Sequence, residues 1–297
     1  MNARIWITET RPQFLLLSLV LGFYGTSVAF AEDGFHLGHA LLATLGVLLA
    51  HISVNTLNDY FDFKSGIDTR TERTPFSGGS GVLPSGGLSA AQVLWLGLGA
   101  LLLAAPIGVY FAVVKGWLLV PLLAAATLCV LLYTPLLLKV PFPEWSAGLG
   151  LGLLPILGFY FAQAGGYSWS ALVAAVPAGI LVHNLLFINE LPDVEADRAG
   201  GRRTTPVMIG QQRSAVVYTV LTGLVYAWIV AFVLAGTMPI WALLALLTLP
   251  LAIKASRGAL AHRNVKELVP ALGANVAVVM LTQLLLGAGY LIDGLVG

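Results

Sequence analysis

Charged side chains are scarce in this sequence. Asp, Glu, Lys and Arg make up only 10% of its 297 residues, and 58% are hydrophobic, whereas soluble globular domains carry about 25% charged residues. A chain of this composition cannot cover a water-facing surface. The sequence therefore excludes a soluble protein and predicts an integral membrane protein.

Cysteine and polar linkers are also scarce. The single cysteine, Cys129, lies in an apolar run, so no intrachain disulfide is possible and a buried structural thiol is expected. No charged or Ser/Pro-rich linker separates the apolar runs, which favours one transmembrane domain over residues 1–297. The net charge of +1 gives no basis for a nucleic-acid partner, and no obligate protein partner is predicted.

Long apolar runs are abundant instead. A membrane-spanning helix needs about 20 predominantly apolar residues. Runs of roughly that length predict an all-α bundle of about nine helices. They cover residues 13–31, 37–57, 88–114, 117–138, 145–164, 169–191, 214–235, 238–253 and 269–292.

The basic residues fall in alternate loops of this arrangement. With a cytoplasmic N-terminus, every Lys and Arg except Lys115 lies on the cytoplasmic side. The positive-inside rule then predicts a multi-pass protein of the cell membrane, with both polar stretches described below in the cytoplasm and the C-terminus outside. The first apolar run resembles a signal peptide, because Ala29-Phe30-Ala31 at its end resembles a cleavage site. The run is longer than the apolar region of a signal peptide, and we interpret it as the first membrane helix.

The stretch from His51 to Pro84 carries the first group of polar residues at membrane depth. Ionisable groups in hydrocarbon cost at least about 2–3 kcal/mol each, so they mark a candidate functional site. Oxygen ligands suit Mg²⁺, which binds one or two carboxylates together with waters and substrate phosphates. At helical spacing the polar side chains form two rows along the helix, and Asp62 belongs to both. One row contains His51, Asn55, Asp59 and Asp62, and the other contains Asn58 and Asp62. His51 lies deepest and is interpreted as a hydrogen-bonded core residue.

Cations and a glycine-rich loop follow this stretch. Lys64, Arg70 and Arg73 come next, and then residues 77–81, whose backbone can approach an anion closely. A glycine-rich loop alone is a weak signal. Beside a carboxylate cluster and three cations, it favours a phosphate-binding site.

The stretch from His183 to Pro206 shows a similar pattern. Pro192 cannot donate a helical hydrogen bond, so a kink is predicted between Glu190 and Asp193, which favours a site over a plain helix end. The residues able to line one face are Asn189, Asp193 and Asp197. The cations that follow are Arg198, Arg202 and Arg203.

The two stretches align as a weak internal repeat, in which Asn58 matches Asn189 and Asp62 matches Asp193. Two pseudo-symmetric halves can hold one Mg²⁺ on each side of a diphosphate. Such a site fits a reaction in which diphosphate leaves, because the developing negative charge needs Lewis acids and fixed cations. A site that opens into the membrane can admit an isoprenoid tail from the side.

These motifs resemble those of a known family. NDYFDFKSGID at 58–68 and NELPDVEADRAGGRRT at 189–204 resemble the two Asp-rich motifs of the UbiA superfamily of intramembrane prenyltransferases. Within it, they are most similar to the motifs of 1,4-dihydroxy-2-naphthoate prenyltransferases of menaquinone synthesis. Arg11-Pro12 and YTPLLLK at 133–139 resemble other family landmarks. The superfamily's first motif usually has an Asp where this chain has Gly66, and Asp68 is the candidate replacement.

The resemblance implies a nine-helix bundle around a central cavity that holds a prenyl diphosphate. It implies that Asn58 and Asp62 hold one Mg²⁺ and that Asp193 and Asp197 hold the other, supported by Asp59 and Asn189. The candidate catalytic residues are Asp59, Asp62, Glu190, Asp193 and Asp197. The candidate diphosphate contacts are Arg73, Lys139 and Arg203, with Arg11, Asn55, Arg70, Tyr133 and Arg202 as further substrate-binding residues.

The expected reaction is transfer of the prenyl group to an electron-rich aromatic ring, with Asp59 or Glu190 orienting the acceptor or taking its proton. Two alternatives stay open. A site that removes diphosphate from a prenyl diphosphate would also serve a cyclase, or a transferase for another acceptor such as a benzoate, a chlorin or a glycerol phosphate. A cation-coupled transporter is disfavoured, because transporters place such carboxylates near the midplane rather than at the inner boundary.

Overall fold

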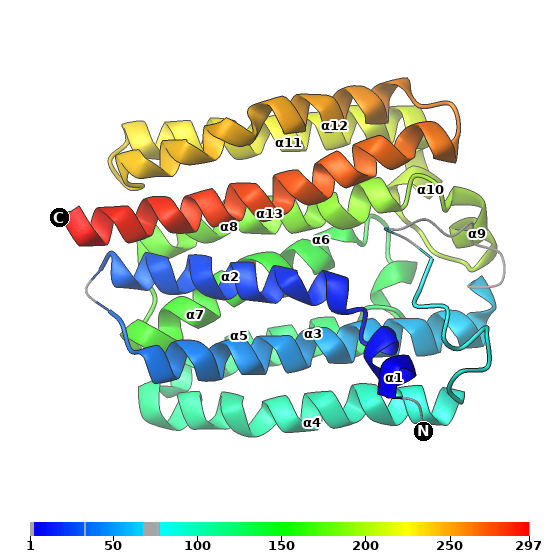
Figure 1. Cartoon of the computed structure of the whole chain (residues 1–297), viewed down its shortest axis with the longest axis horizontal. Coiled ribbons are helices and arrows are strands. Elements are labelled where there is room, and N and C mark those ends of the chain that lie inside the picture. Colours follow the sequence, from blue (N-terminus) through cyan, green and yellow to red (C-terminus); the bar gives the residue numbers. More distant parts are fainter. Residues whose placement is uncertain (1–2, 33, 68–75, 77, 297) are drawn as a thin grey trace.

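The chain forms a bundle of long helices that lie roughly side by side (Figure 1). The computed structural model describes residues 3–32, 34–67, 76 and 78–296. Within these ranges all regular secondary structure is helical. Eight helical segments have the length and composition to cross a membrane, and a ninth, Trp117–Leu132, is apolar but shorter. The predicted all-α bundle of about nine membrane helices is therefore confirmed.

The membrane helices are joined by connections of different length, and the longest are residues 66–89 and 190–210. In chain order they are α2 (Pro12–Phe30), α3 (Leu37–Ser65), α4 (Ala90–Lys115), η2 with α5 (Trp117–Leu119 and Val120–Leu132), α6, η4 and α7 (Glu144–Gly148, Leu149–Leu153 and Leu154–Ala164), α8 (Trp169–Asn189), α11 (Gln211–Leu234), η5 with α12 (Ile240–Thr248 and Leu249–Ala261), and α13 (Val265–Val296). Shorter elements are α1 (Ala3–Glu9), η3 (Leu137–Lys139), α9 (Val194–Ala199) and α10 (Thr205–Ile209).

Helix α3 is longer than its hydropathy predicts. The apolar run ends near residue 57, but the helix continues to Ser65 through the polar residues of the first stretch. Gly66 ends it with φ of 76°, a left-handed conformation that glycine adopts without steric cost, and its N–H bonds the carbonyl of Asp62. The polar turns of α3 thus project beyond the apolar part of the bundle on a rigid helix.

The kink predicted at Pro192 is a complete break. Helix α8 ends at Asn189, and the chain turns before α9 begins at Val194. Because proline cannot donate to the carbonyl four residues earlier, α8 cannot continue through this point. The break turns α9 and α10 across the end of the bundle where α3 ends and α1 lies (Figure 1).

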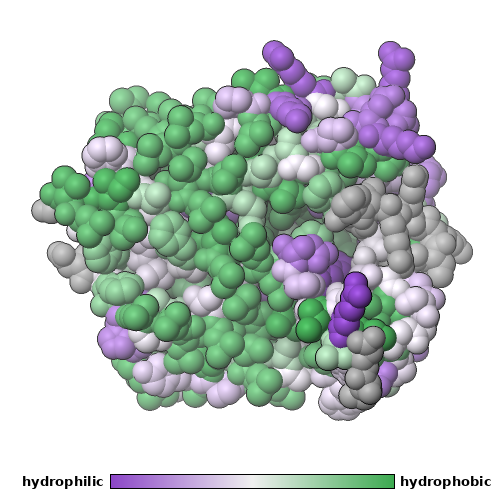
Figure 2. Space-filling view, in the orientation of Figure 1, coloured by the Kyte–Doolittle hydropathy of each residue, from purple (hydrophilic) through white to green (hydrophobic). Residues whose placement is uncertain are grey.

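Polar and apolar side chains are segregated along the bundle. In the face shown in Figure 2, hydrophobic residues cover most of the length, and hydrophilic ones gather mainly at the end that holds α1, α9 and α10. Both polar stretches lie at that end, as their sequence pattern predicts.

Close helix packing brings η4 against α8. A Cβ atom added to Gly152 would lie 2.6 Å from the carbonyl oxygen of Ala178 and 2.8 Å from Cα of Gly179. Small residues allow membrane helices to approach this closely, and no flexible side chain is available to yield. The π-helical turn η4 is therefore fixed against α8 by backbone contact.

Gly152→Ala is expected to destabilise the bundle by about 1–3 kcal/mol, because the methyl group overpacks this contact. The matched control is Gly223→Ala in α11, where an added Cβ meets nothing within 4 Å. Thermal unfolding of both variants in detergent measures the effect. Equal stability of the two variants would contradict the packing argument.

Candidate active site

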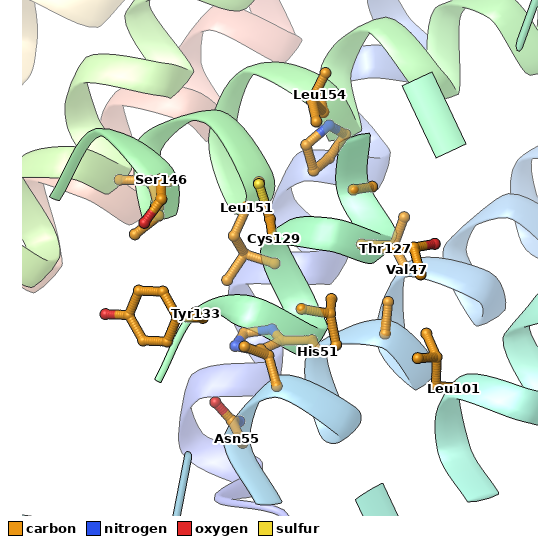
Figure 3. Close-up of a pocket in the computed structure, with 18 of the residues that line it drawn as sticks. Val47, His51, Asn55, Leu101, Thr127, Cys129, Tyr133, Ser146, Leu151 and Leu154 are labelled. Atoms are coloured by element: carbon orange, nitrogen blue, oxygen red, sulfur yellow. The ribbon is translucent and has the colours of Figure 1, made fainter. Parts of the chain in front are cut away.

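A cavity of about 1130 Å³ runs through the bundle. Its walls come from α2, α3, α4, α5, α7, α8 and α13 and are mostly apolar. Figure 3 shows Val47, His51 and Asn55 of α3 and Thr127 and Cys129 of α5 among the residues that line the pocket. The charged, amide and histidine residues of the two stretches that reach its lining are His51, Asn55, Asn58, Asp62, Asn189, Glu190, Asp193, Asp197 and Arg202, and Arg11 before α2 joins them.

The end of α3 presents Asn58 and Asp62 to the cavity. They lie one helical turn apart, and the Asn58 amide donates to Asp62 Oδ2 at 3.1 Å and to Thr134 Oγ1 at 3.0 Å. The amide nitrogen is therefore engaged on both sides. The side-chain carbonyl oxygen of Asn58 and the carboxylate of Asp62 are the oxygen atoms on this wall that can act as metal ligands.

The break after α8 presents a second set of oxygens. Asn189 Oδ1, Glu190 Oε2 and Asp193 Oδ1 are buried, and none of them has a hydrogen-bond partner within the described part of the chain. Buried acceptors without a donor are costly, and in native proteins such groups call for an explanation, such as a bound ion. The residues that carry these oxygens line the cavity, so the three oxygens can act as ligands to a cation.

Arg202 joins the two stretches. Its guanidinium pairs with the carboxylate of Asp62 through Nη2 and with Asp197 Oδ1 at 3.0 Å through Nη1. All three side chains are largely buried. One cation thus neutralises one carboxylate from each stretch, and the fork geometry of arginine suits this bridge.

Asp193 forms no ion pair with any of the residues that the structure describes. Burial, followed by the charge of Asp197, raises the pKa of Asp193 to about 7. Burial also raises the pKa of Asp197, an effect that Arg202 opposes. A bound cation would lower the pKa of Asp193, because it favours the ionised form.

Asp59 faces away from the cavity. It is 1% exposed, pairs with Arg11 and accepts the Ser80 N–H at 2.9 Å. Arg11 has φ of 53°, a strained conformation for a non-glycine residue that this ion pair helps to hold. Asn55 lines the cavity and donates to the Thr10 carbonyl at 3.1 Å. Asp59 therefore fixes the chain before α2 and the loop after α3, and has no direct access to a substrate in the cavity.

Other predicted residues are placed differently. Tyr133 lines the cavity, and so do Gly78 and Gly79 of the glycine-rich loop. Lys139 and Arg203 are exposed and lie outside the lining, and their contact with the diphosphate stays a prediction. The Arg203 N–H bonds the Leu138 carbonyl at 2.9 Å, and this backbone pairing turns Arg202 inward and Arg203 outward. Asp68, Arg70 and Arg73 lie outside the described residues.

His51 behaves as predicted. It is buried and shares a hydrogen bond of 2.9 Å with Ser18 of α2. Its ring nitrogen is therefore engaged in the core, although one edge of the residue borders the cavity.

The sequence pattern left Glu144 without a role. Glu144 is fully buried and accepts hydrogen bonds from the Thr205 backbone N–H and, at 2.9 Å, from Thr205 Oγ1. It therefore anchors the segment that carries Arg202 to the start of α6. A single acidic residue in a short loop offers no sequence signal for this contact.

No three His, Cys, Asp or Glu residues form a metal-binding group in the described ranges. The ion pairs explain this absence, because the Arg202 guanidinium lies between the carboxylates of Asp62 and Asp197. It also agrees with Mg²⁺ chemistry, in which water and phosphate oxygens complete a shell begun by one or two carboxylates.

Comparisons with known proteins agree with this geometry. The chain is 27% identical to the 1,4-dihydroxy-2-naphthoate octaprenyltransferase of Bacillus subtilis, over 96% of this chain and 91% of the relative. It is 30% identical to the enzyme of that name from Mycobacterium tuberculosis, over 97% of each. A UbiA homologue from Archaeoglobus fulgidus, solved with DMAPP and Mg²⁺, has a similar fold, with a TM-score of 0.63 and 15% identity over 98% of this chain and 97% of that one.

A sequence model of the UbiA prenyltransferase family matches residues 16–287, nearly the whole bundle. Both polar stretches fall within the match, and so do the helices that line the cavity, except for the first turn of α2 and the last turns of α13. The chain therefore belongs to the UbiA prenyltransferase family and is a multi-pass membrane enzyme that transfers prenyl groups.

Proposed function

We propose that this enzyme transfers a long isoprenoid chain from a prenyl diphosphate to 1,4-dihydroxy-2-naphthoate, with Mg²⁺ as cofactor and release of diphosphate. The observation that carries the proposal is the joining of two Asp-rich stretches, with Arg202 between them, at one end of a large apolar cavity. The acceptor is inferred from the two octaprenyltransferases, which match this chain over nearly its full length.

The residues fit two Mg²⁺ ions. Asn58 and Asp62 would hold one on the α3 wall, and Asp193 and Asp197, supported by Asn189, would hold the other at the break after α8. When bound, Mg²⁺ would act as a Lewis acid that stabilises the negative charge of the leaving diphosphate. The unpartnered oxygens of Asn189 and Asp193 support this assignment. The metal-bound homologue is the precedent for the cofactor.

Arg202 is the fixed cation of the site. Arginine binds phosphate oxygens through two parallel N–H groups, and its buried position excludes competing water. When a diphosphate enters, Arg202 is placed to exchange part of its contact with Asp62 and Asp197 for the phosphate oxygens. Arg70 and Arg73 remain predicted contacts from the loop that follows α3.

The apolar walls protect the reactive carbon chain. The bond between the first prenyl carbon and oxygen breaks, and diphosphate leaves with both electrons. The allylic cation is then attacked by the electron-rich ring, which loses a proton, or its carboxylate as CO₂ in the naphthoate case. Exclusion of bulk water matters because water would otherwise trap the cation.

Glu190 is the proposed acceptor-positioning group. It lines the cavity, and its Oε2 is buried without a hydrogen-bond partner among the described residues. Burial, and then the nearby charge of Glu144, raises the pKa of Glu190 well above its usual value. A protonated Glu190 can donate to an acceptor hydroxyl or carboxylate. Asp59 has no such access, because it is bound to Arg11 and Ser80.

The bundle would lie in the cell membrane with its site at the cytoplasmic face. The end with α1, α9 and α10 carries the residues that the positive-inside rule assigns to the cytoplasm. We also propose that residues 1–297 form a single transmembrane domain, as the sequence predicts.

Turnover by purified protein tests the proposal. The protein is incubated with Mg²⁺, prenyl diphosphates of several lengths and a panel of naphthoate, benzoate and glycerol phosphate acceptors, and products are identified by mass. We expect prenylated naphthoate and diphosphate release that depends on the acceptor. Preferred transfer to another acceptor would correct the substrate, and diphosphate release with a hydrocarbon product and no acceptor would replace transfer with cyclisation.

A further inference from the structure

Helix α1 packs on the segment that follows the glycine-rich loop. Ile5 and Trp6 of α1 pack against the apolar cluster formed by Val82, Leu83 and Leu88. This contact lies at the end of the bundle where α3 ends (Figure 1). Apolar packing therefore attaches α1 to the chain that leaves the glycine-rich loop.

Glu9, the last residue of α1, makes a polar contact with the loop itself. Glu9 is fully buried, and its Oε2 accepts a hydrogen bond of 2.8 Å from the Ser80 hydroxyl. The Ser80 N–H donates to Asp59 Oδ2 of α3 at 2.9 Å. A buried carboxylate is costly unless its oxygens are hydrogen-bonded, so the Ser80 hydroxyl helps to stabilise Glu9. Ser80 is therefore held by one carboxylate from α1 and one from α3.

The two residues before Ser80 border the cavity. Gly78 and Gly79 line it, with φ of 92° and 73°, a region that residues with side chains rarely adopt. Among the described residues, no acceptor receives a hydrogen bond from either glycine N–H. Successive N–H groups of such a turn can form a concave binding site for an anion. The two N–H groups are therefore available to a phosphate group in the cavity.

We propose that Glu9 is a positioning residue for substrate binding: by holding the Ser80 hydroxyl, it fixes the backbone of Gly78 and Gly79 where the two N–H groups bind the diphosphate. This inference rests on the proposed function, since it takes the prenyl diphosphate as the ligand. Neither Glu9 nor Ser80 lines the cavity, so both act through the two glycines. Glycine has the most backbone freedom to lose, and fixing the turn before the ligand arrives reduces the entropy that is lost on binding.

Loss of the hydrogen bond between Glu9 and Ser80 should weaken diphosphate binding and leave the chemical step intact. Asp62, Asp193 and Arg202 are not altered by such a change. The glycine N–H groups bind the diphosphate both before and during the reaction, so a misplaced loop raises KM more than it lowers kcat.

The test measures prenyl transfer by Ser80→Ala and Glu9→Ala. We expect KM for geranylgeranyl diphosphate to rise by about 10-fold in each variant, with kcat within about 3-fold and KM for the acceptor unchanged. The inhibition constant of inorganic diphosphate should rise by the same factor, because the proposed contact is to the diphosphate alone. A merely structural defect reduces the amount of active enzyme, and so lowers the apparent kcat without changing KM.

A double-mutant cycle tests whether the two residues act through one contact. The variant with both Glu9→Ala and Ser80→Ala should raise KM no more than either single substitution, since the second removes a bond that is already lost. Matched controls are Thr8→Ala of α1 and Ser85→Ala of the following segment, both exposed, which should leave KM within about 2-fold. An unchanged KM in Ser80→Ala, which removes only a hydroxyl, or in folded Glu9→Ala would overturn the proposal. Additive effects in the double variant, or equal effects in the controls, would do the same.

Binding without an acceptor separates this inference from the proposed reaction. Binding of an unreactive thio-analogue of geranylgeranyl diphosphate is measured with Mg²⁺ and no acceptor. Weaker binding by the variants than by the unsubstituted protein supports the positioning role even if the acceptor is not a naphthoate. Equal binding would overturn this role and leave prenyl transfer intact, whereas no binding of any prenyl diphosphate by the unsubstituted protein would overturn the proposed function and this inference with it.

Discussion

Replacing Asp193 with Asn is expected to reduce prenyl transfer by about 100-fold or more, because the substitution removes a charged oxygen ligand that would stabilise the leaving diphosphate. The fold should remain intact. The pKa of Asp193 is raised to about 7 in the folded protein, so ionisation of this group disfavours folding as the pH rises from about 4 towards 7. Asn removes that penalty. Turnover measures the loss of transfer, and thermal unfolding at pH 7 measures the change in stability.

Asp62→Asn should give a similar loss of turnover, since Asp62 holds the corresponding place in the first stretch. The matched control is Glu195→Gln, an exposed carboxylate on α9 whose partner is Arg198 at 3.0 Å. It should leave turnover within about 2-fold, because exposed ion pairs contribute little. If Asp62→Asn and Asp193→Asn both stay active with Mg²⁺, the proposal of two metal ions is wrong.

Arg202→Ala is expected to destabilise the protein by about 3 kcal/mol and to abolish most turnover. Removing one partner of a buried ion pair leaves uncompensated charge, here on both Asp62 and Asp197. Mg²⁺ should restore part of the lost stability, because a metal ion can replace the missing cation between these carboxylates. Thermal unfolding with and without Mg²⁺ measures this recovery separately from activity.

The comparison variant is Arg198→Ala, which removes an arginine that is about half exposed and that, among the residues the structure describes, pairs only with exposed Glu195. We expect little change in stability or turnover. A stable and active Arg202→Ala variant would show that the bridge between the two stretches is dispensable. If Mg²⁺ does not restore any of the lost stability, Mg²⁺ does not bind in the place of the Arg202 guanidinium between Asp62 and Asp197.

Much of the fold follows from the sequence, because spans of apolar residues and the distribution of basic residues are local properties. The polar end of α3 was the exception. Hydropathy ends the segment near residue 57, whereas the helix continues to its cap at Gly66. Helical hydrogen bonds do not require apolar side chains, so a helix that leaves the membrane can extend further than its hydrophobic run.

The direction of individual side chains depended on tertiary contacts. Asp59 and Asp62 lie three residues apart on one helix, yet Asp62 reaches the cavity while Asp59 pairs with Arg11. Arg202 and Arg203 are adjacent, and the backbone bond from Arg203 to Leu138 decides which one turns inward. Neither choice is encoded in spacing alone.

The exposure of individual apolar residues has no sequence signature either. Apolar residues that face lipid, a closed core or an apolar cavity have the same hydropathy, so Leu102 and Val279 cannot be distinguished in the sequence. Their exposures of 69% and 0% appear only once the helices are packed.

We propose that metal ions and a diphosphate occupy the space between the two Asp-rich stretches. Anomalous scattering from crystals grown with Mn²⁺ and an unreactive thio-analogue of a prenyl diphosphate tests it most directly. We predict Mn²⁺ peaks beside the carboxylates of Asp62 and Asp193, with the diphosphate between them and in contact with Arg202. A diphosphate bound away from both carboxylates, with no metal peak at either, would contradict the account.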